Sequence, residues 1–303
     1  MSQRVAITGA SGLIGGALSA SLSARGDEVV HLVRRAPRTA AEIRWDPSRR
    51  ELDPAALDGV DAVVHLAGAG VGDHRWTPAY KQQIFASRVD STHTVASALA
   101  ELAGRGHSPV LVCGSAIGIY GPDRGDEVLT ETSSPGQGFL CDVVRAWESA
   151  SKPAEDAGLR VVHARTGIVL SPEGGAMARL LPLARLGLAG PLGSGRQYWS
   201  WITLQDEVRA LTWAIDQPTL SGAVNLTGPQ PLPQIEVTRA VASALGRPAL
   251  LPAPSLALKL VLGEFSSDIL GSLRVMPSLL TASGFTFEHD TAERAAEWLV
   301  EQS

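Results

Sequence analysis

Short apolar segments alternate with amphipathic segments through the first 170 residues of the chain. The apolar segments are rich in β-branched residues, which is typical of strands that are buried on both faces. They span residues 4–8, 28–33, 61–68, 109–115 and 160–166. Between the first two, Leu13, Ala17, Leu18 and Leu22 recur at helical spacing, and Gly26 ends the pattern. Strands that alternate with helices predict a doubly wound α/β fold around a parallel sheet.

The pattern changes after about residue 170. Residues 171–201 are rich in Gly, Pro, Leu and Arg, and residues 247–254 contain three prolines. A helix over 203–216 and a strand over 223–228 are predicted between these segments, and both can return to the sheet. We therefore expect a Rossmann domain over 1–170 with a returning segment at about 199–228. Residues 171–198 and 229–303 would form a smaller, discontinuous lobe.

Composition narrows the classes of function. The 303 residues are 45% hydrophobic and 19% charged, enough to bury a large core, and the formal net charge of −5 argues against a nucleic-acid-binding surface. No apolar run approaches the ~20 residues of a membrane span, and the chain starts without a basic and apolar leader. Cys113 and Cys141 are too far apart for a metal motif and too few for a disulfide framework. We expect a cytoplasmic protein without a bound metal.

A glycine-rich motif, TGASGLIG, follows the first predicted strand and opens the first predicted helix at residues 8–15. Gly9 permits a tight turn, Gly12 lets the backbone approach a pyrophosphate, and Gly15 lets the helix pack closely on the strand. The free N–H groups at the helix N-terminus favour an anion. The motif predicts a dinucleotide site formed by Gly9, Ser11, Gly12, Leu13, Ile14 and Gly15.

The end of the second strand indicates which dinucleotide would bind. An acidic residue about 20 positions after the glycines would accept a hydrogen bond from a ribose 2′-hydroxyl group. This strand instead ends in Val33, Arg34 and Arg35. Arg34 can pair with a 2′-phosphate through its planar set of donors, which favours NADP(H) over NAD(H). Alternatively, the two arginines only end a strand at the surface.

Further motifs give the chain a family resemblance. They are DAVVHLAG (61–68), HRWT (74–77), SRVDST (87–92), SAIGIYG (115–121), RTGIVLSPEGGA (165–176), GPLGSGRQYWSWI (190–202) and VMPSLLTASGF (275–285). With the glycine motif, this series resembles the atypical extended short-chain dehydrogenases/reductases known as the epimerase family, or as SulA homologues with a presumed role in cell division. The resemblance covers essentially the whole chain.

The resemblance implies a set of cofactor contacts beyond the glycine motif. Leu66, Ala67 and Gly68 would lie beside the adenosine. Gln83 and Arg88 would reach the cofactor from the following helix, although Arg88 can equally be a solvated helix residue. Ser115 would lie near the nicotinamide. Alternatively, its hydroxyl only satisfies the hydrogen-bonding groups at the end of the strand.

The segment GFLCDVVRAWE (138–148) departs from the wider superfamily. There, a Tyr-x-x-x-Lys pair transfers the proton and holds the ribose, and extended members often carry a Glu four residues after the lysine. Counting back from Glu148 places Val144 in the lysine position and Leu140 in the tyrosine position. We interpret both as an apolar helix face. The chain has no lysine between Lys81 and Lys152 that could replace the missing one.

Other residues could replace the missing acid. Tyr120 is the best placed, because it follows Ser115 at the carboxyl edge of the predicted sheet, where doubly wound folds bind ligands. Asp142 and the loop 190–202 are alternatives, and Tyr120 can also be a packing residue. Tyr120 and Ser115 are therefore the predicted catalytic residues.

The loop 190–202 carries the predicted substrate contacts. Arg196 offers a bidentate donor and Trp199 a flat apolar face, although the tryptophans of this loop can also be core anchors. These features favour an NADP(H)-dependent oxidoreductase that acts on a small carbonyl or nucleotide-sugar-like substrate. The alternatives are a non-catalytic NADP(H) sensor and, third, a nucleotide-sugar epimerase or dehydratase. The oligomeric state would be a monomer or a homodimer.

Overall fold

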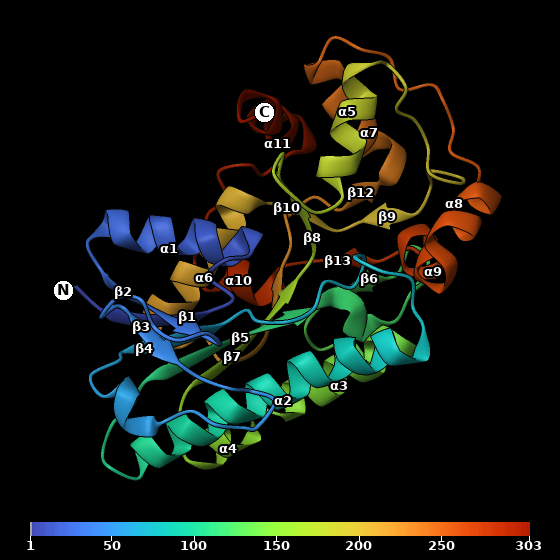
Figure 1. Cartoon of the computed structure of the whole chain (residues 1–303). Coiled ribbons are helices and arrows are strands. Elements are labelled where there is room, and N and C mark those ends of the chain that lie inside the picture. The colour runs from blue at the N-terminus through green and yellow to red at the C-terminus, as the bar shows by residue number, and fades with distance from the viewer. Residues whose placement is uncertain (1) are drawn as a thin grey trace.

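A seven-stranded parallel sheet runs through the computed structural model, which describes residues 2–303 (Figure 1). In spatial order the strands are β11 (Gly222–Leu226), β7 (Val161–Thr166), β5 (Val110–Ala116), β4 (Ala62–His65), β1 (Arg4–Thr8), β2 (Glu28–Val33) and β3 (Glu42–Arg44). The order reverses direction between β1 and β4, which is the topological switch point of a doubly wound sheet. The predicted fold class is confirmed.

Both faces of the sheet are buried. In β1, Val5 and Ile7 belong to the core on one face, while Ala6 belongs to the core on the other. In β5, Val112 belongs to the same core as Val5 and Ile7, and Leu111 belongs to the core on the opposite face. Successive side chains of a strand point to opposite faces, so continuous apolar runs are what a sheet covered on both sides requires.

Helices cover both faces of the sheet (Figure 1). One face carries α1 (Leu13–Arg25) and α6 (Leu204–Asp216), and the other carries α2 (Pro78–Ala103), α3 (Phe139–Ser149) and α4 (Lys152–Asp156). The helix α1 ends at Gly26, which has a φ of 93° in the left-handed region that favours glycine. The helix α2 begins after Thr77, whose side chain accepts a hydrogen bond from the N–H of Tyr80.

Most of the remaining elements lie together beyond one end of the sheet (Figure 1). The helices there are α5 (Met177–Arg185), α7 (Gln234–Ala244), α8 (Ser255–Leu262), α9 (Ser266–Leu270) and α11 (Ala292–Glu301). The short helix α10 (Ser278–Ala282) lies instead beside β11, and its Leu280 belongs to the core under α1 and α6. Short strands pair as β6 (Val128–Leu129) with β13 (Arg274–Val275), β8 (Ile168–Leu170) with β10 (Trp201–Thr203), and β9 (Tyr198–Trp199) with β12 (Leu232–Pro233). Single 3₁₀ turns are η1 (Pro54–Leu57), η2 (Ile117–Tyr120) and η3 (Gly263–Phe265).

A separate apolar core joins α5, α7 and α11, with Leu181, Val241 and Leu299 among its buried residues. The boundaries of the two predicted lobes stay a prediction. Among residues 2–303, no helix has both the length and the apolar character needed to cross a membrane.

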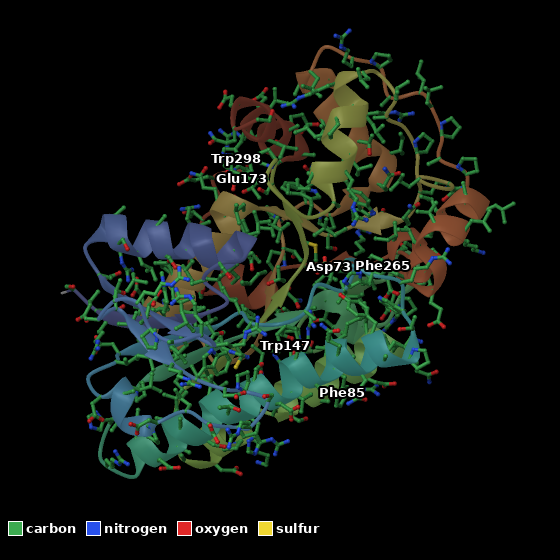
Figure 2. All side chains as sticks on the ribbon, in the orientation of Figure 1. Asp73, Phe85, Trp147, Glu173, Phe265 and Trp298 are labelled. Atoms are coloured by element: carbon green, nitrogen blue, oxygen red, sulfur yellow. The ribbon has the colours of Figure 1, made fainter. Side chains whose placement is uncertain are left out.

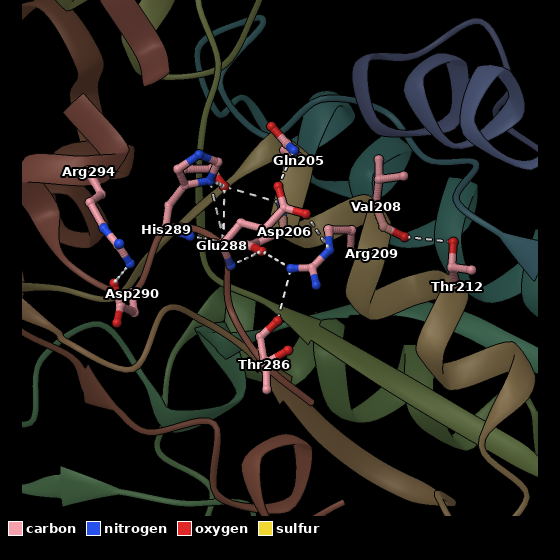
Figure 3. A network of polar contacts seen from close by, with 11 residues as sticks. Gln205, Asp206, Val208, Arg209, Thr212, Thr286, Glu288, His289, Asp290 and Arg294 are labelled. Carbon is pink, nitrogen blue, oxygen red and sulfur yellow. Dashed lines mark hydrogen bonds and ion pairs between the residues drawn. The ribbon is translucent and has the colours of Figure 1, made fainter. Parts of the chain in front are cut away.

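A polar network ties the C-terminal segment to the start of α6 (Figure 3). The Asp206 carboxylate is 1% exposed and accepts hydrogen bonds from the backbone N–H groups of Glu288 and His289, each at 2.9 Å. It also accepts a hydrogen bond from Arg209 at 2.6 Å, and Arg209 donates to the carbonyl of Thr286. The network therefore fixes residues 286–289 against the sheet-covering helix.

Candidate functional site

A cavity of about 900 Å³, here called the first cavity, lies at the carboxyl ends of β1, β2 and β4. Its walls are the glycine loop, the end of β2, the loop after β4 and one face of α2. The predicted cofactor residues that line it are Gly9, Ser11, Gly12, Arg34, Arg35, Leu66, Ala67, Gly68 and Gln83. Doubly wound sheets bind ligands at this edge, beside the switch point.

The glycine loop has the geometry that a phosphate site needs. Gly9 has a φ of 70°, and a Cβ atom there would lie 2.8 Å from the carbonyl carbon of Leu66. A Cβ atom at Gly15 would lie 2.3 Å from the Gly9 carbonyl oxygen, so only glycine lets α1 pack this closely. Gly12 caps α1 without a side chain, and the first turn of α1 has no acidic residue. The helix N-terminus can therefore receive an anion.

Three residues of the predicted motif face elsewhere. Leu13 lines another cavity of about 570 Å³, which is bounded by residues 171–173 and Trp298. Figure 2 labels Glu173 and Trp298, which lie close to each other in that view. The loop after β8 covers this part of α1, because a Cβ atom at Gly174 would lie 2.9 Å from Leu13 Cδ2. Ile14 packs against the core on the same face of the sheet as α1. Leu13, Ile14 and Gly15 therefore shape the start of α1 and do not line the first cavity.

The two arginines at the end of β2 have different environments. Arg35 donates two hydrogen bonds to the Glu42 carboxylate, at 2.8 and 2.5 Å. These bonds, with one from the backbone N–H of Arg38, lower the pKa of Glu42 to about 2. Arg34 lines the first cavity and is exposed, with no hydrogen bond or ion pair to any side chain among residues 2–303. Arg34 can therefore meet an anion without first breaking a bond.

Arg88 supports the wall of the first cavity from behind. Its Nη1 donates to the carbonyls of Ala69 and Ile84, at 2.9 and 3.1 Å, and its guanidinium carbon lies 5.0 Å from the centre of the Trp147 ring. A Cβ atom at Gly68 would lie 3.3 Å from that carbon. Burial lowers the pKa of Arg88 to about 10, so the group stays charged at neutral pH.

A buried histidine, which sequence reasoning missed, holds the loop after β4. Ser91 Oγ donates to the carbonyl of Ser87 and therefore accepts from His65 Nε2, at 3.0 Å. His65 Nδ1 then accepts from the Thr8 hydroxyl at 2.7 Å, and that hydroxyl oxygen accepts from the N–H groups of Leu66 and Ala67. Burial lowers the pKa of His65 to about 3, so the ring is neutral. The only sequence signal was a histidine within an apolar strand.

Ser115 and Tyr120, the predicted catalytic pair, belong to a buried polar cluster. Ser115 donates to Glu148 at 2.7 Å, and Arg165 donates to both Glu148 oxygens, at 2.8 and 2.9 Å. Tyr120 donates to Asn225 at 2.8 Å and accepts from Arg165 at 3.2 Å. Burial raises the pKa of Tyr120. Burial also acts to raise the pKa of Glu148, but the bonds and charge of Arg165 outweigh it, so that pKa lies below its usual range.

Both hydroxyl groups are therefore engaged within the protein. Ser115 is 5% exposed and Tyr120 is fully buried, and neither lines the first cavity. Their catalytic role stays a prediction, and the bonds that they make favour a positioning role. Sequence reasoning did not foresee that Arg165, 17 residues after Glu148, would complete this cluster.

Leu140 and Val144 lie on the apolar side of α3. Val144 is 3% exposed and belongs to the same buried cluster as Ile119 of η2. A Cβ atom at Gly118 would lie 3.5 Å from Leu140 Cβ and 4.0 Å from Val144 Cγ2. These contacts are those of the predicted apolar helix face.

A second cavity, of about 540 Å³, opens beside Leu140. Its walls are formed by the first turn of α3 and the residues just before that helix, and by the segment from α8 to α9. Trp76, which precedes α2, also lines it. Trp76 packs on Phe139 and Phe265, with ring centroids 5.0 and 5.4 Å apart. Ala69 lines the first cavity and Trp76 the second, so a single loop connects the two.

The predicted substrate residues lie outside these cavities. Trp199 is 4% exposed and packs in the core of α5, α7 and α11, as the alternative interpretation had it. The Arg196 side chain is exposed, and its backbone N–H donates to Ser194. A substrate role for these two residues stays a prediction.

A glycine loop at the switch point of a parallel sheet defines a dinucleotide-binding protein of the Rossmann type. Residues 5–226 match the model of the NAD dependent epimerase/dehydratase family, and residues 253–299 match a domain of unknown function, DUF1731. The chain belongs to the NAD dependent epimerase/dehydratase family, and the resemblance inferred from the sequence motifs is confirmed.

Individual relatives agree with this assignment. An epimerase family protein of Mycobacterium bovis is 48% identical over 292 residues, which cover 96% of this chain and 95% of that protein. The crystal structure of human epimerase family protein SDR39U1 (isoform 2) with NADPH superposes with a TM-score of 0.90 at 30% identity, covering 99% and 100% of the two chains. A nucleoside-diphosphate sugar epimerase from Corynebacterium glutamicum gives a TM-score of 0.79 at 35% identity, covering 99% of this chain and 58% of that one.

Proposed function

We propose that this protein is an NADP(H)-dependent oxidoreductase that acts on a small carbonyl compound or the corresponding alcohol. The adenosine and pyrophosphate would occupy the first cavity, with the pyrophosphate at the N-terminus of α1. Leu66, Ala67, Gly68 and Gln83 would contact the cofactor, while Leu13, Ile14, Gly15 and Arg88 hold the surfaces that do so. The bound nicotinamide would supply or accept the hydride.

The arrangement of charge at the end of β2 carries this proposal. Both carboxylates that line the first cavity are bridged to arginines, Glu42 to Arg35 and Asp90 to Arg50. Arg34 is left as a cation without a protein partner among the described residues. A 2′-phosphate would meet attraction here and no bare carboxylate, which supports a preference for NADP(H). The human relative solved with NADPH adds support.

A non-catalytic NADP(H) sensor is the second candidate. It is favoured by the apolar side chains at positions 140 and 144 and by the engaged hydroxyls of Ser115 and Tyr120. A classical sugar epimerase or dehydratase comes third, since both chemistries need a positioned acid–base pair. The second cavity beside Leu140 favours the enzyme, because a protein that only senses the cofactor does not require a substrate space there.

The test is the affinity for NADPH and NADH, measured by fluorescence titration of the wild-type protein and of Arg34→Ala. A charge-assisted phosphate contact contributes about 1.5–3 kcal/mol, so the variant should bind NADPH roughly ten- to a hundredfold more weakly. Its affinity for NADH should change little, since NADH has no 2′-phosphate.

Arg44→Ala is the matched control, because Arg44 is an exposed arginine on the neighbouring β3 that does not line the first cavity. This variant should retain the affinity of the wild type for NADPH. Equal affinity of the wild-type protein for the two cofactors would contradict the proposal.

A further inference from the structure

The second cavity has the position expected of a substrate pocket. Leu140 lines it, and the sequence resemblance assigns the superfamily tyrosine to this position of the helix. The loop after β4 runs from the wall of the first cavity to the wall of the second. A volume of about 540 Å³ is within the range of small-molecule sites.

One carboxyl group in this cavity has no role in the arrangements described so far. Asp268, in α9, lines the cavity and is partly buried. Its Oδ2 lies 3.2 Å from the Ser267 hydroxyl, which shares its one hydrogen between this oxygen and the Glu264 carbonyl at 2.8 Å. No arginine or lysine forms an ion pair with it among residues 2–303. Burial raises the pKa of Asp268 to about 6.

The other charged and titratable groups around the cavity are accounted for. Lys259 of α8 is exposed, and Glu264 of η3 is bridged to Lys81 of α2. The Cys141 thiol of α3 lies 3.0 Å from the Ile119 carbonyl and 3.1 Å from the Gly136 carbonyl, which share its one hydrogen, and burial raises the pKa of this thiol. Asp268 is therefore the carboxyl group of this cavity that is free to exchange a proton with a bound molecule.

We propose that Asp268 is the proton donor and acceptor of this protein and takes the part that a tyrosine at position 140 would have played. This inference rests on the proposed function. During reduction, hydride passes from NADPH to the carbonyl carbon, and the C=O π electrons move to the oxygen. That oxygen takes the proton of the Asp268 carboxylic acid, which leaves alcohol, NADP⁺ and an Asp268 carboxylate. Water then returns the proton, and oxidation runs the same steps in reverse.

The residues that line the second cavity also restrict the class of substrate that it can bind. Trp76 and Phe139 present aromatic surfaces, and Leu140 and Pro122 add apolar ones. Among the described residues that line the cavity none is an arginine, and Lys259 is its one cation. A diphosphate would need several such donors, and it would be repelled by the carboxylates of Glu264 and Asp268. The cavity fits a small uncharged ketone or alcohol with a ring better than it fits a nucleotide sugar.

The first experiment measures NADPH oxidation by the whole protein with acetophenone and cyclohexanone. Asp268→Asn should lose about 10²–10⁴-fold in kcat, the usual effect of removing a positioned acid. Its affinity for NADPH should stay within twofold of the wild type. Glu236→Gln is the matched control, since it removes an exposed carboxylate of α7 that lines neither cavity, and its kcat should remain within about threefold.

The pH profile adds a readout that a structural role would not move. For reduction, kcat/KM of the wild type should fall about tenfold per pH unit above pH 6, because the acid form is lost. Ser267→Ala removes a bond that stabilises the carboxylate, so it should move this limb to higher pH. In Asp268→Asn, kcat/KM should no longer fall with pH over this range.

Binding provides a readout that is independent of turnover. Saturation-transfer NMR of the cofactor-free protein with acetophenone should show binding that Leu140→Trp, which fills the cavity, removes. If Asp268→Asn still binds NADPH and still reduces the ketones at the wild-type rate, this inference is wrong, while the proposed function stands. The inference also fails if neither ketone binds to or is reduced by a protein that binds NADPH. Loss of NADPH binding itself would overturn the proposed function as well.

Discussion

Glu207 is a fully buried carboxyl group on the side of α6 that faces the sheet. Its Oε1 accepts a hydrogen bond from the Thr166 hydroxyl at 2.7 Å, while its Oε2 is buried with no partner among the described residues. Burial raises the pKa of Glu207 from 4.5 to about 8. In the folded protein this group is therefore mostly neutral at pH 7, whereas in the unfolded chain it is ionised.

This difference predicts how Glu207→Gln changes stability with pH. Because the folded pKa is the higher one, the wild type has its full stability below pH 4.5 and loses it progressively as the pH rises to about 8. Glutamine stays neutral and suffers no such loss. Relative to the wild type, the variant should therefore gain a few kcal/mol of unfolding free energy between pH 5 and pH 8, at about 1.4 kcal/mol per pKa unit.

Urea unfolding at the two pH values measures the effect. Glu101→Gln, at an exposed position on α2, serves as the control and should show the same pH dependence as the wild type. A constant difference between Glu207→Gln and the wild type at pH 5 and pH 8 would mean that Glu207 is ionised in the folded state.

Residue by residue, the sequence predicted the part of the site that is local in the chain. The glycine loop and Arg34 were identifiable because their function follows from neighbours within a few positions. Asp268 carried no such signal, since an isolated aspartate after two serines is usual for a surface turn. The bond from Ser115 to Glu148 was equally hidden, because it depends on how far α3 lies from β5.

At the scale of the elements, the first turn of α6 holds the segment before α11 in place. Thr203 caps the helix by accepting the N–H of Asp206, and the Asp206 carboxylate binds a distant part of the chain. That carboxylate accepts bonds from residues more than 80 positions later in the chain (Figure 3). Asparagine has one acceptor oxygen where aspartate has two, so it must leave donors unpaired.

Asp206→Asn should therefore lower the unfolding free energy by about 2–4 kcal/mol, because charge-assisted bonds are lost and buried donors remain. Chemical denaturation measures it. Asp290→Asn breaks the exposed pair with Arg294 in the same segment and should cost less than about 1 kcal/mol. Equal losses in the two variants would show that the network adds nothing beyond a surface ion pair.

The predicted strands match the structure closely, since buried parallel strands leave continuous apolar runs in a sequence. The helix predicted over 203–216 is α6, at Leu204–Asp216. The smaller elements were not predicted individually. The helix α8 illustrates the reason, because Leu256, Leu260 and Val261 are 67–70% exposed and give no amphipathic pattern that marks a buried face.

At the scale of the whole molecule, the two cavities join parts of the chain that sequence reasoning treated separately. The first cavity draws on residues 9–91, which the predicted Rossmann domain contains. The second brings residues 76 and 137–141 against residues 259–268, and the Lys81–Glu264 pair links the same regions. No short-range pattern encodes such pairings. The predicted cytoplasmic location and oligomeric state stay predictions.

Cofactor binding should stabilise the whole fold, and this linkage separates the two proposed roles. A ligand at 100 times its Kd adds about 2.7 kcal/mol to the unfolding free energy, which raises Tm by about 5 °C in a chain of this size. NADH, if ten- to a hundredfold weaker at the same concentration, should add only about 0.4–1.4 kcal/mol. In a thermal-shift assay, Arg34→Ala should reduce the NADPH response towards that of NADH, since both ligands then bind without the phosphate contact. Asp268→Asn should keep the full NADPH response, because Asp268 lies outside the first cavity. A response lost in Asp268→Asn and kept in Arg34→Ala would reverse both assignments.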